Sequence, residues 1–154
     1  GRGYQSGTMY GIVNHIRAVD LLVAHPRVNP RQIAVIGHSL GGKMALYAGA
    51  FDPRLKAIVS SEPGISLKFS NYQDFWYFGK AIEKLPPEAD QQDLIAQISP
   101  RPFLLIAGES ADGDKSWPFL APNDNAGMIN HRTGHSPTED SVQKAMEWLE
   151  RYLR

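Results

Sequence analysis

The chain has 154 residues, with 16 lysines and arginines against 16 aspartates and glutamates, 42% hydrophobic residues and no cysteine. This length suits a single domain over residues 1–154, which would bury roughly 70% of its unfolded surface. The balanced charge excludes a basic field for nucleic acid or anionic lipid, and no apolar stretch approaches the roughly 20 residues of a membrane helix. Without cysteine there is no disulfide and no thiolate nucleophile. We therefore expect a cytoplasmic protein, with export not excluded, that binds a small neutral or mildly polar ligand.

Hydrophobic periodicity predicts helices that alternate with strands. Apolar residues at helical spacing predict a first helix over residues 8–24, with Thr8 as its N-cap, and a second over 40–51. A final helix follows the capping box Ser136-Pro137-Thr138-Glu139, which would place Pro137 at the first helical position. Apolar runs predict strands over residues 32–37, 55–61, 102–108 and 128–131. This alternation indicates an α/β fold with a mostly parallel sheet flanked by helices.

Residues 63–99 interrupt the alternation with an irregular, aromatic-rich stretch and a short helix near 90–98. We interpret this segment as a cap-like insertion over a pocket. Large aromatic side chains fill cores more often than they bind substrate, which favours a packing role for them. The alternative is that Trp76, Phe75 and Trp117 line the pocket, and the substrate would then carry an apolar or ring-shaped group.

The motif with the clearest chemistry is Gly37-His38-Ser39-Leu40-Gly41, which follows an apolar strand and opens a helix. A Gly-x-Ser-x-Gly string in this setting is the nucleophile elbow of α/β-hydrolases. Small residues on both sides let the backbone bend sharply, so that the serine stands clear of its neighbours. Ser39 is therefore the candidate nucleophile.

A serine hydroxyl needs an imidazole to remove its proton, and five histidines compete for this role. His135 lies immediately before the final helix and is the preferred base. His131, four residues earlier, is the alternative and would otherwise form a structural hydrogen bond. We assign no catalytic role to His15 and His25, in and after the first helix, or to His38, whose side chain should leave the elbow in another direction.

The imidazole in turn needs a carboxylate to hold its tautomer and to stabilise its positive charge. In folds of this kind the order along the chain is serine, then acid, then histidine. The polar loop after the third strand supplies Asp112 as the first choice and Asp114 as its rival, at the carboxyl end of a parallel strand. Glu62, just after the second strand, is the third possibility, and the sequence leaves the three open.

Stabilisation of a tetrahedral intermediate requires backbone N–H groups aimed at the developing oxyanion. One should come from Leu40, directly after the nucleophile, and the second belongs to a loop after an earlier strand. Only a short lead and one helix precede the nucleophile strand here, so this second donor has no evident source. No metal cluster, phosphate-binding glycine loop or dinucleotide fingerprint is present, and we expect no cofactor and no metal.

These motifs resemble the C-terminal portion of an α/β-hydrolase, nearest to bacterial dienelactone-hydrolase-like or acyl-hydrolase-like proteins. The elbow around Ser39, the Pro100–Leu104 stretch and Gly134-His135 carry the resemblance. It implies that only about half of the family's sheet is present. True dienelactone hydrolases use a cysteine nucleophile, so the serine here points to an ordinary ester rather than a lactone.

The predicted function is that of a serine hydrolase of the carboxylesterase type, which cleaves a small-molecule ester through an acyl-enzyme formed by Ser39, Asp112 and His135. The alternative is a non-catalytic hydrolase frame that acts as a binding or scaffold piece, because the first strands and one oxyanion loop have no counterpart in the sequence. The first strand would have an unpaired edge, which favours a homo-oligomer or association with a missing N-terminal segment.

Overall fold

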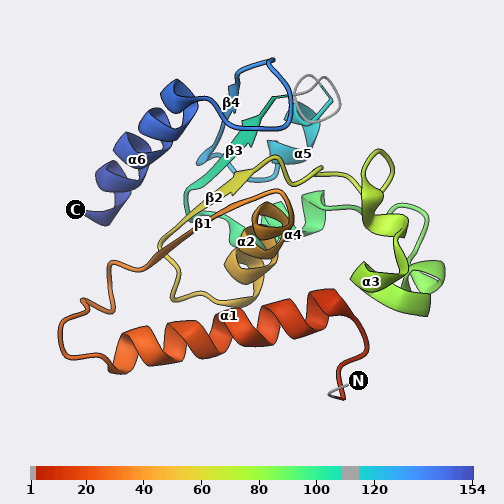
Figure 1. Cartoon of the computed structure of the whole chain (residues 1–154), viewed down its shortest axis with the longest axis horizontal. Helices are drawn as coiled ribbons and strands as arrows, with labels where there is room; N and C mark the ends of the chain where they lie inside the picture. The colour runs from red at the N-terminus through yellow and green to blue at the C-terminus, as the bar shows by residue number, and fades with distance from the viewer. Residues whose placement is uncertain (1–2, 109–114) are drawn as a thin grey trace.

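A four-stranded parallel sheet in the order β1-β2-β3-β4 forms the centre of the molecule (Figure 1). The computed structural model describes residues 3–108 and 115–154. The strands are β1 (Ala34–His38), β2 (Ala57–Ser61), β3 (Phe103–Ala107) and β4 (Ala126–Asn130). The helices are α1 (Gly7–Ala24), α2 (Leu40–Phe51), α3 (Phe75–Phe78), α4 (Gln92–Ile98), α5 (Trp117–Leu120) and α6 (Glu139–Leu153), with 3-10 turns η1 (Asn71–Gln73) and η2 (Gly79–Lys84). The predicted α/β class, a parallel sheet flanked by helices, is confirmed.

Helices cover the two central strands on both faces, which is why these strands carry apolar runs rather than an alternating pattern. Every residue of β2 and β3 is buried. Successive side chains point to opposite faces, so Ile58 packs in the core on the α2 and α4 side, whereas Val59 packs with Ala145 and Leu149 of α6. Helix α1 lies along the outside of α2 (Figure 1).

Strand β1 forms one edge of the described sheet and pairs only with β2 there. Ile36, in the middle of β1, is 50% exposed although it lies in an apolar strand. The expected unpaired edge of this strand is thus present within residues 3–108 and 115–154. None of the described helices has both the length and the apolar character of a membrane span.

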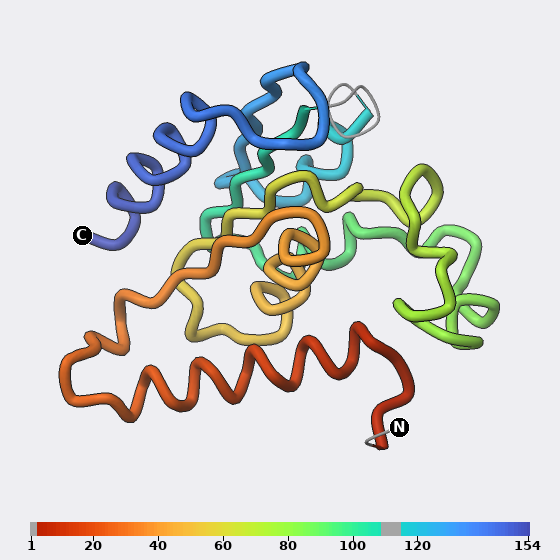
Figure 2. The backbone as a smooth tube through the Cα atoms, viewed as in Figure 1, coloured from red at the N-terminus to blue at the C-terminus, as the bar shows by residue number. Residues whose placement is uncertain are grey.

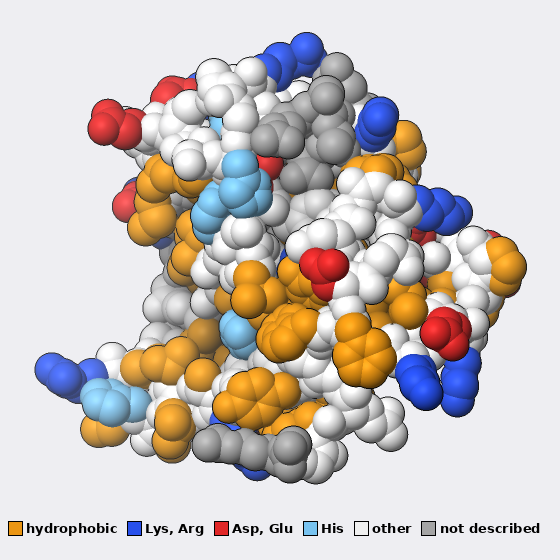
Figure 3. Space-filling view, turned by 45° about the vertical axis from the view of Figure 1, so that its right-hand side comes forward, with side chains coloured by type: hydrophobic (Ala, Val, Ile, Leu, Met, Phe, Trp, Pro, Cys, Tyr) orange, Lys and Arg blue, Asp and Glu red, His pale blue; other side chains and the backbone are white. Residues whose placement is uncertain are grey.

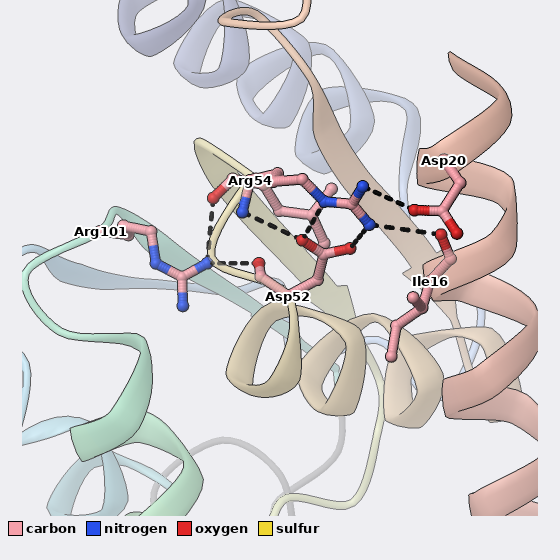
Figure 4. Close-up of polar contacts among 6 residues, drawn as sticks. Ile16, Asp20, Asp52, Arg54 and Arg101 are labelled. Atoms are coloured by element: carbon pink, nitrogen blue, oxygen red, sulfur yellow. Dashed lines mark hydrogen bonds and ion pairs between the residues drawn. The ribbon is translucent and has the colours of Figure 1, made fainter. Parts of the chain in front are cut away.

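A charged network ties α1 to the turn after α2 (Figure 4). The guanidinium of Arg54 donates to the carboxylate of Asp52, at 2.8 and 2.7 Å, and to Asp20 of α1 at 2.6 Å, and the backbone N–H of Arg54 also donates to Asp52, at 3.0 Å. Hydrogen bonds from Arg54 hold the pKa of Asp52 below its ordinary value, against the effect of burial. Arg101, just before β3, donates to three backbone carbonyl oxygens at the end of α2 and in the turn. The network therefore fixes the helix that follows the elbow relative to α1 and β3.

Two predicted helix starts differ from the structure by a few residues. The N-cap of α1 is Ser6, whose hydroxyl accepts from the backbone N–H of Met9 at 3.2 Å, and Thr8 lies buried in the first turn. The N-cap of α6 is Thr138, so Pro137 precedes the helix instead of occupying its first position. Hydroxyl residues two positions apart offer alternative N-caps, so sequence alone places a helix start only to within a few residues.

Candidate active site

The carboxyl ends of parallel strands meet at one edge of a sheet, and the segments that carry the candidate site residues come together there (Figure 2). Ser39 follows β1 directly, and Glu62 follows β2. The loop between β4 and α6 carries His131 and His135. Three segments that are far apart in the sequence are thereby brought to one end of the sheet.

The turn at Ser39 has the strained geometry expected from its motif. Ser39 adopts φ 55° and ψ −117°, a conformation that costs a non-glycine residue on the order of 1–3 kcal/mol. A Cβ at Gly37 would collide with the carbonyl oxygen of Gly41, and one at Gly42 would collide with the carbonyl oxygen of Ser61. The flanking glycines are therefore required by close backbone contact, which permits the sharp passage from β1 into α2.

The hydroxyl of Ser39 lies within hydrogen-bond distance of an imidazole. The distance from Ser39 Oγ to His135 Nε2 is 2.9 Å, although the two residues are separated by 96 positions in the chain. This is the distance at which an imidazole can accept the proton of an attacking hydroxyl. The two residues that the sequence selects as nucleophile and base are thus in direct contact.

The side chain of His38 also approaches this pair, contrary to the expectation that it would leave the elbow in another direction. Its ring centroid lies 4.9 Å from that of His135, and its Nδ1 lies 3.1 Å from Ser61 Oγ. Burial, and then the nearby His135, lower the pKa of His38 below its ordinary value.

A buried carboxylate lies beside these groups. The side chain of Glu62 is fully buried, and its Oε1 lies 3.1 Å from Nε2 of the buried His131. A Cβ at Gly108 would collide with both of these side chains, so the glycine at the end of β3 leaves the space that they occupy. His131 thus has the structural contact that the sequence analysis gives as its alternative role.

Of the three acids considered from the sequence, Glu62 lies in the described part of the chain and lines the same cleft as Ser39 and His135. Asp112, the first choice, and its rival Asp114 lie outside the described residues. The structure therefore gives a location for one of the three candidates.

The cleft above Ser39 has a volume of about 250 Å³ and a largely polar lining. The lining includes Lys43, one helical turn after Ser39. The sequence analysis did not identify Lys43, although residues four apart share a helix face. Lys43 is 4% exposed. Its Nζ donates to Ser70 Oγ at 2.8 Å and to the carbonyl oxygen of Pro63, and it lies 4.0 Å from the centroid of the Tyr72 ring. The lining comprises Ser39, Lys43, Glu62, Pro63, Gly64, Phe69, Ser70, Asn71, Tyr77 and His135.

The aromatic residues of this cleft differ from those considered in the sequence analysis. Phe69 and Tyr77 line it, whereas Trp76 lines a separate cleft beside α1. Phe75 and Trp117 are 73% and 57% exposed and are absent from the lining of the Ser39 cleft. Segment 63–99 thus contributes Phe69 and Tyr77 to the wall of the site, rather than Phe75 and Trp76.

Leu40 is the first residue of α2, and its backbone N–H therefore has no acceptor within the helix. The N-terminus of a helix carries a partial positive charge that favours an anion at this position. Within residues 3–108 and 115–154, no group of three or more histidine, cysteine, aspartate or glutamate side chains is arranged to hold a metal ion.

Comparison with known proteins places the chain among proteins of related architecture. Residues 8–67 match the family described as "Glucuronyl esterase, fungi". The chain is 31% identical to YtaP of Bacillus subtilis (strain 168), over 92% of this chain and 53% of that protein. It is also 31% identical to carbohydrate esterase MZ0003 from an unknown prokaryotic organism, over 68% of this chain and 28% of that protein.

Among solved structures, a carbohydrate esterase family 15 glucuronoyl esterase from Caldicellulosiruptor kristjansonii superposes with a TM-score of 0.78. The match covers 96% of this chain and 50% of that one, at 22% sequence identity. The likeness shows a shared fold, and the chain spans about half of the matched structure and of YtaP.

Proposed function

This chain has the α/β-hydrolase fold, and we propose that it is a serine esterase that cleaves carbohydrate esters through an acyl-enzyme. The observation that carries the proposal is the 2.9 Å contact between Ser39 Oγ, on a strained strand-to-helix turn, and His135 Nε2. A serine in this conformation, with an imidazole at this distance, is the arrangement that serine hydrolases use for attack.

In the proposed reaction, His135 Nε2 accepts the Ser39 hydroxyl proton as Oγ bonds to the ester carbonyl carbon. The carbonyl oxygen becomes an oxyanion, which the N–H of Leu40 at the start of α2 stabilises. The intermediate expels the alcohol, which takes the proton from His135, and leaves the acyl group on Ser39. Water then attacks the acyl-enzyme and gives one proton to His135. As the bond between Ser39 Oγ and the acyl carbon breaks, His135 returns this proton to Oγ and the acid is released.

The proposal assigns the triad acid to Glu62. Its carboxylate is fully buried, lines the cleft that holds Ser39 and His135, and follows the strand next to the nucleophile strand. A carboxylate in such surroundings acts strongly on a neighbouring imidazolium, because little water screens the two charges. Asp112, the first choice from the sequence, is the alternative, and their amide variants distinguish the two.

The substrate class follows from the lining of the cleft and from the relatives. The ammonium of Lys43, the hydroxyl of Ser70 and the amide of Asn71 supply hydrogen-bonding groups around Ser39, as a ligand rich in hydroxyl groups requires. MZ0003 is named as a carbohydrate esterase, and the matched solved structure is a glucuronoyl esterase. Both observations favour a sugar ester over a purely aliphatic one.

The first test is intact-mass analysis after incubation with a fluorophosphonate, which reports an activated serine without a choice of substrate. We expect a single adduct that disappears in Ser39→Ala and in His135→Ala. Ser136→Ala is the matched control, because this exposed serine neighbours the base and should leave labelling unchanged. Folded protein that gives no adduct would overturn the proposal and leave a hydrolase frame without catalysis.

A second assay then addresses the substrate. We expect hydrolysis of acetylated xylobiose or of a methyl ester of glucuronic acid at a kcat/KM above that of p-nitrophenyl butyrate. Labelled protein that hydrolyses only the butyrate ester would retain the serine esterase and remove the carbohydrate assignment.

A further inference from the structure

A second cleft, with a volume of about 280 Å³, lies between the start of α1 and the short helix α3. Tyr4, Ser6, Gly7, Tyr10 and Trp76 line it. Figure 3 shows hydrophobic side chains gathered on this face, over α1 and α3, below the upper group of histidine side chains. Trp76 is 49% exposed and Tyr10 is 37% exposed, so large aromatic surfaces there are open to a ligand.

The aromatic rings of this cleft pack against neighbouring groups. A Cβ at Gly7 would collide with the indole of Trp76, so the helix backbone and the indole are in close contact. The rings of Tyr4 and Tyr10 meet edge to face, with their centroids 5.3 Å apart. Such preorganised rings lose little conformational entropy when a ligand packs on them.

The second cleft adjoins the Ser39 cleft through α3. Trp76 lines the second cleft, and Tyr77, the next residue, lines the cleft of Ser39 and His135. The two rings are in edge-to-face contact, with centroids 5.2 Å apart. The walls of the two clefts are therefore neighbours, and a ligand with several linked rings can extend from one cleft toward the other.

The lining specifies the chemistry of the occupant. None of its described residues carries a charge, which disfavours an ionic group there. Aromatic faces pack on the C–H faces of a sugar ring, while Ser6 and the tyrosine hydroxyls can exchange hydrogen bonds with sugar hydroxyls. A volume of about 280 Å³ lies just below the ~300–1,000 Å³ typical of ligand sites and suits one ring.

We propose that this cleft is a subsite for a neutral sugar ring of the glycan whose ester is cleaved at Ser39. The proposal rests on the proposed function for the choice of a sugar over another neutral ring. The contribution of the subsite is to position the chain of sugars, and none of its residues takes part in the chemistry.

The chain has three tryptophans, Trp76, Trp117 and Trp148, which makes indole N–H signals in NMR a direct readout. We would titrate 15N-labelled Ser39→Ala protein with xylotetraose, cellotetraose and mannotetraose, each to 20 mM, and with benzyl alcohol. We expect at least one oligosaccharide to shift the Trp76 signal and to leave the signals of Trp117 and Trp148 in place. The absence of a Trp76 shift with all three sugars would overturn the proposal, as would a shift with benzyl alcohol alone.

Variants then test the cleft itself. Trp76→Ala and Tyr10→Ala should each weaken the oligosaccharide affinity about tenfold or more, whereas Phe75→Ala, on the same short helix but outside the lining, should not. Equal losses in Phe75→Ala would overturn the assignment to this cleft. If Trp76→Ala does not fold, Tyr10→Ala still tests the cleft. Fluorophosphonate labelling of Ser39 needs no sugar and therefore tests the proposed function separately.

Discussion

Replacement of Glu62 by glutamine tests the assignment of the triad acid, because it removes the charge and preserves the size of a fully buried side chain. In the proposed mechanism His135 becomes positively charged as Ser39 attacks, and the carboxylate stabilises that charge. If the carboxylate lies about 4 Å from the His135 imidazolium in the reacting complex, two unit charges at an effective dielectric constant near 20 interact with about 4 kcal/mol. Loss of this interaction predicts a fall in kcat of about 10³-fold.

The contact between Glu62 and His131 supplies the control for this experiment. If the carboxylate served only to hold the loop through His131, then His131→Gln would reduce activity as much as Glu62→Gln does. If Glu62 acts on His135, His131→Gln should retain a kcat at least tenfold above that of Glu62→Gln. Urea unfolding of each variant shows whether the loss is one of stability or of catalysis.

The assay is the hydrolysis of the best ester of the panel, together with the rate of fluorophosphonate labelling. Asp112→Asn is measured beside Glu62→Gln, and its kcat is expected to stay within about threefold of the wild type. A kcat in Glu62→Gln above about one tenth of the wild type, with a 10³-fold loss in Asp112→Asn, would refute the argument and return the acid to the loop after β3.

Three further predictions concern stability. Gly42→Ala should lower the free energy of unfolding by about 1–3 kcal/mol in urea titrations, because the added Cβ meets the carbonyl oxygen of Ser61. Gly41→Ala is the control and should be neutral or slightly stabilising, because the space around Gly41 is open. Equal effects of the two substitutions would refute the steric reasoning. Asp52→Asn should cost about 2 kcal/mol at pH 7. Because the folded pKa of Asp52 is held below its ordinary 3.8, this contribution is present above pH 3.8 and fades as the pH falls through the folded value, so wild type and variant should converge in acid. The pKa of His38 in the folded protein lies below its ordinary 6.5, so the unfolded chain takes up a proton first as the pH falls below 6.5. The free energy of unfolding should therefore fall less steeply with pH in His38→Gln than in the wild type over this range. Parallel plots of the free energy of unfolding against pH would contradict the lowered pKa.

The parts of the structure that the sequence predicted are those dictated by local chemistry. The apolar run before Ser39 and the glycines around it predict both the strand and the strained turn, because only small residues permit those backbone contacts. His135 is found from its place before the last helix. The α/β class follows from strands without alternation, since strands buried on both faces contain few polar residues.

The parts that it missed depend on packing between distant segments. The sequence names Glu62 only as the third of three candidate acids, and its burial beside Gly108 and His131 is visible only in the structure. The His38 side chain points toward Ser61 on the neighbouring strand. The two residues are 23 positions apart, so the residues around His38 in the sequence do not predict this contact. Lys43 could have been found from its position one turn after Ser39, but a lysine on a helix is usually exposed, and its burial depends on Ser70 and Tyr72.

Every described group assigned to the chemistry comes from a segment that follows β1, β2 or β4, and these strands lie together within one sheet. The contact between Ser39 and His135 therefore depends on parallel pairing inside this chain, although the chain spans about half of its relatives. Because the sheet fixes these segments relative to one another, activation of Ser39 can be measured on the chain as it stands. The rate of ester turnover also depends on the donors that stabilise the oxyanion, and the backbone N–H of Leu40 is one of them. Loss of a single oxyanion donor costs on the order of 10²–10³ in kcat. Fast labelling of Ser39 combined with slow ester turnover would thus identify oxyanion stabilisation, rather than the nucleophile and base, as the limiting part of the site.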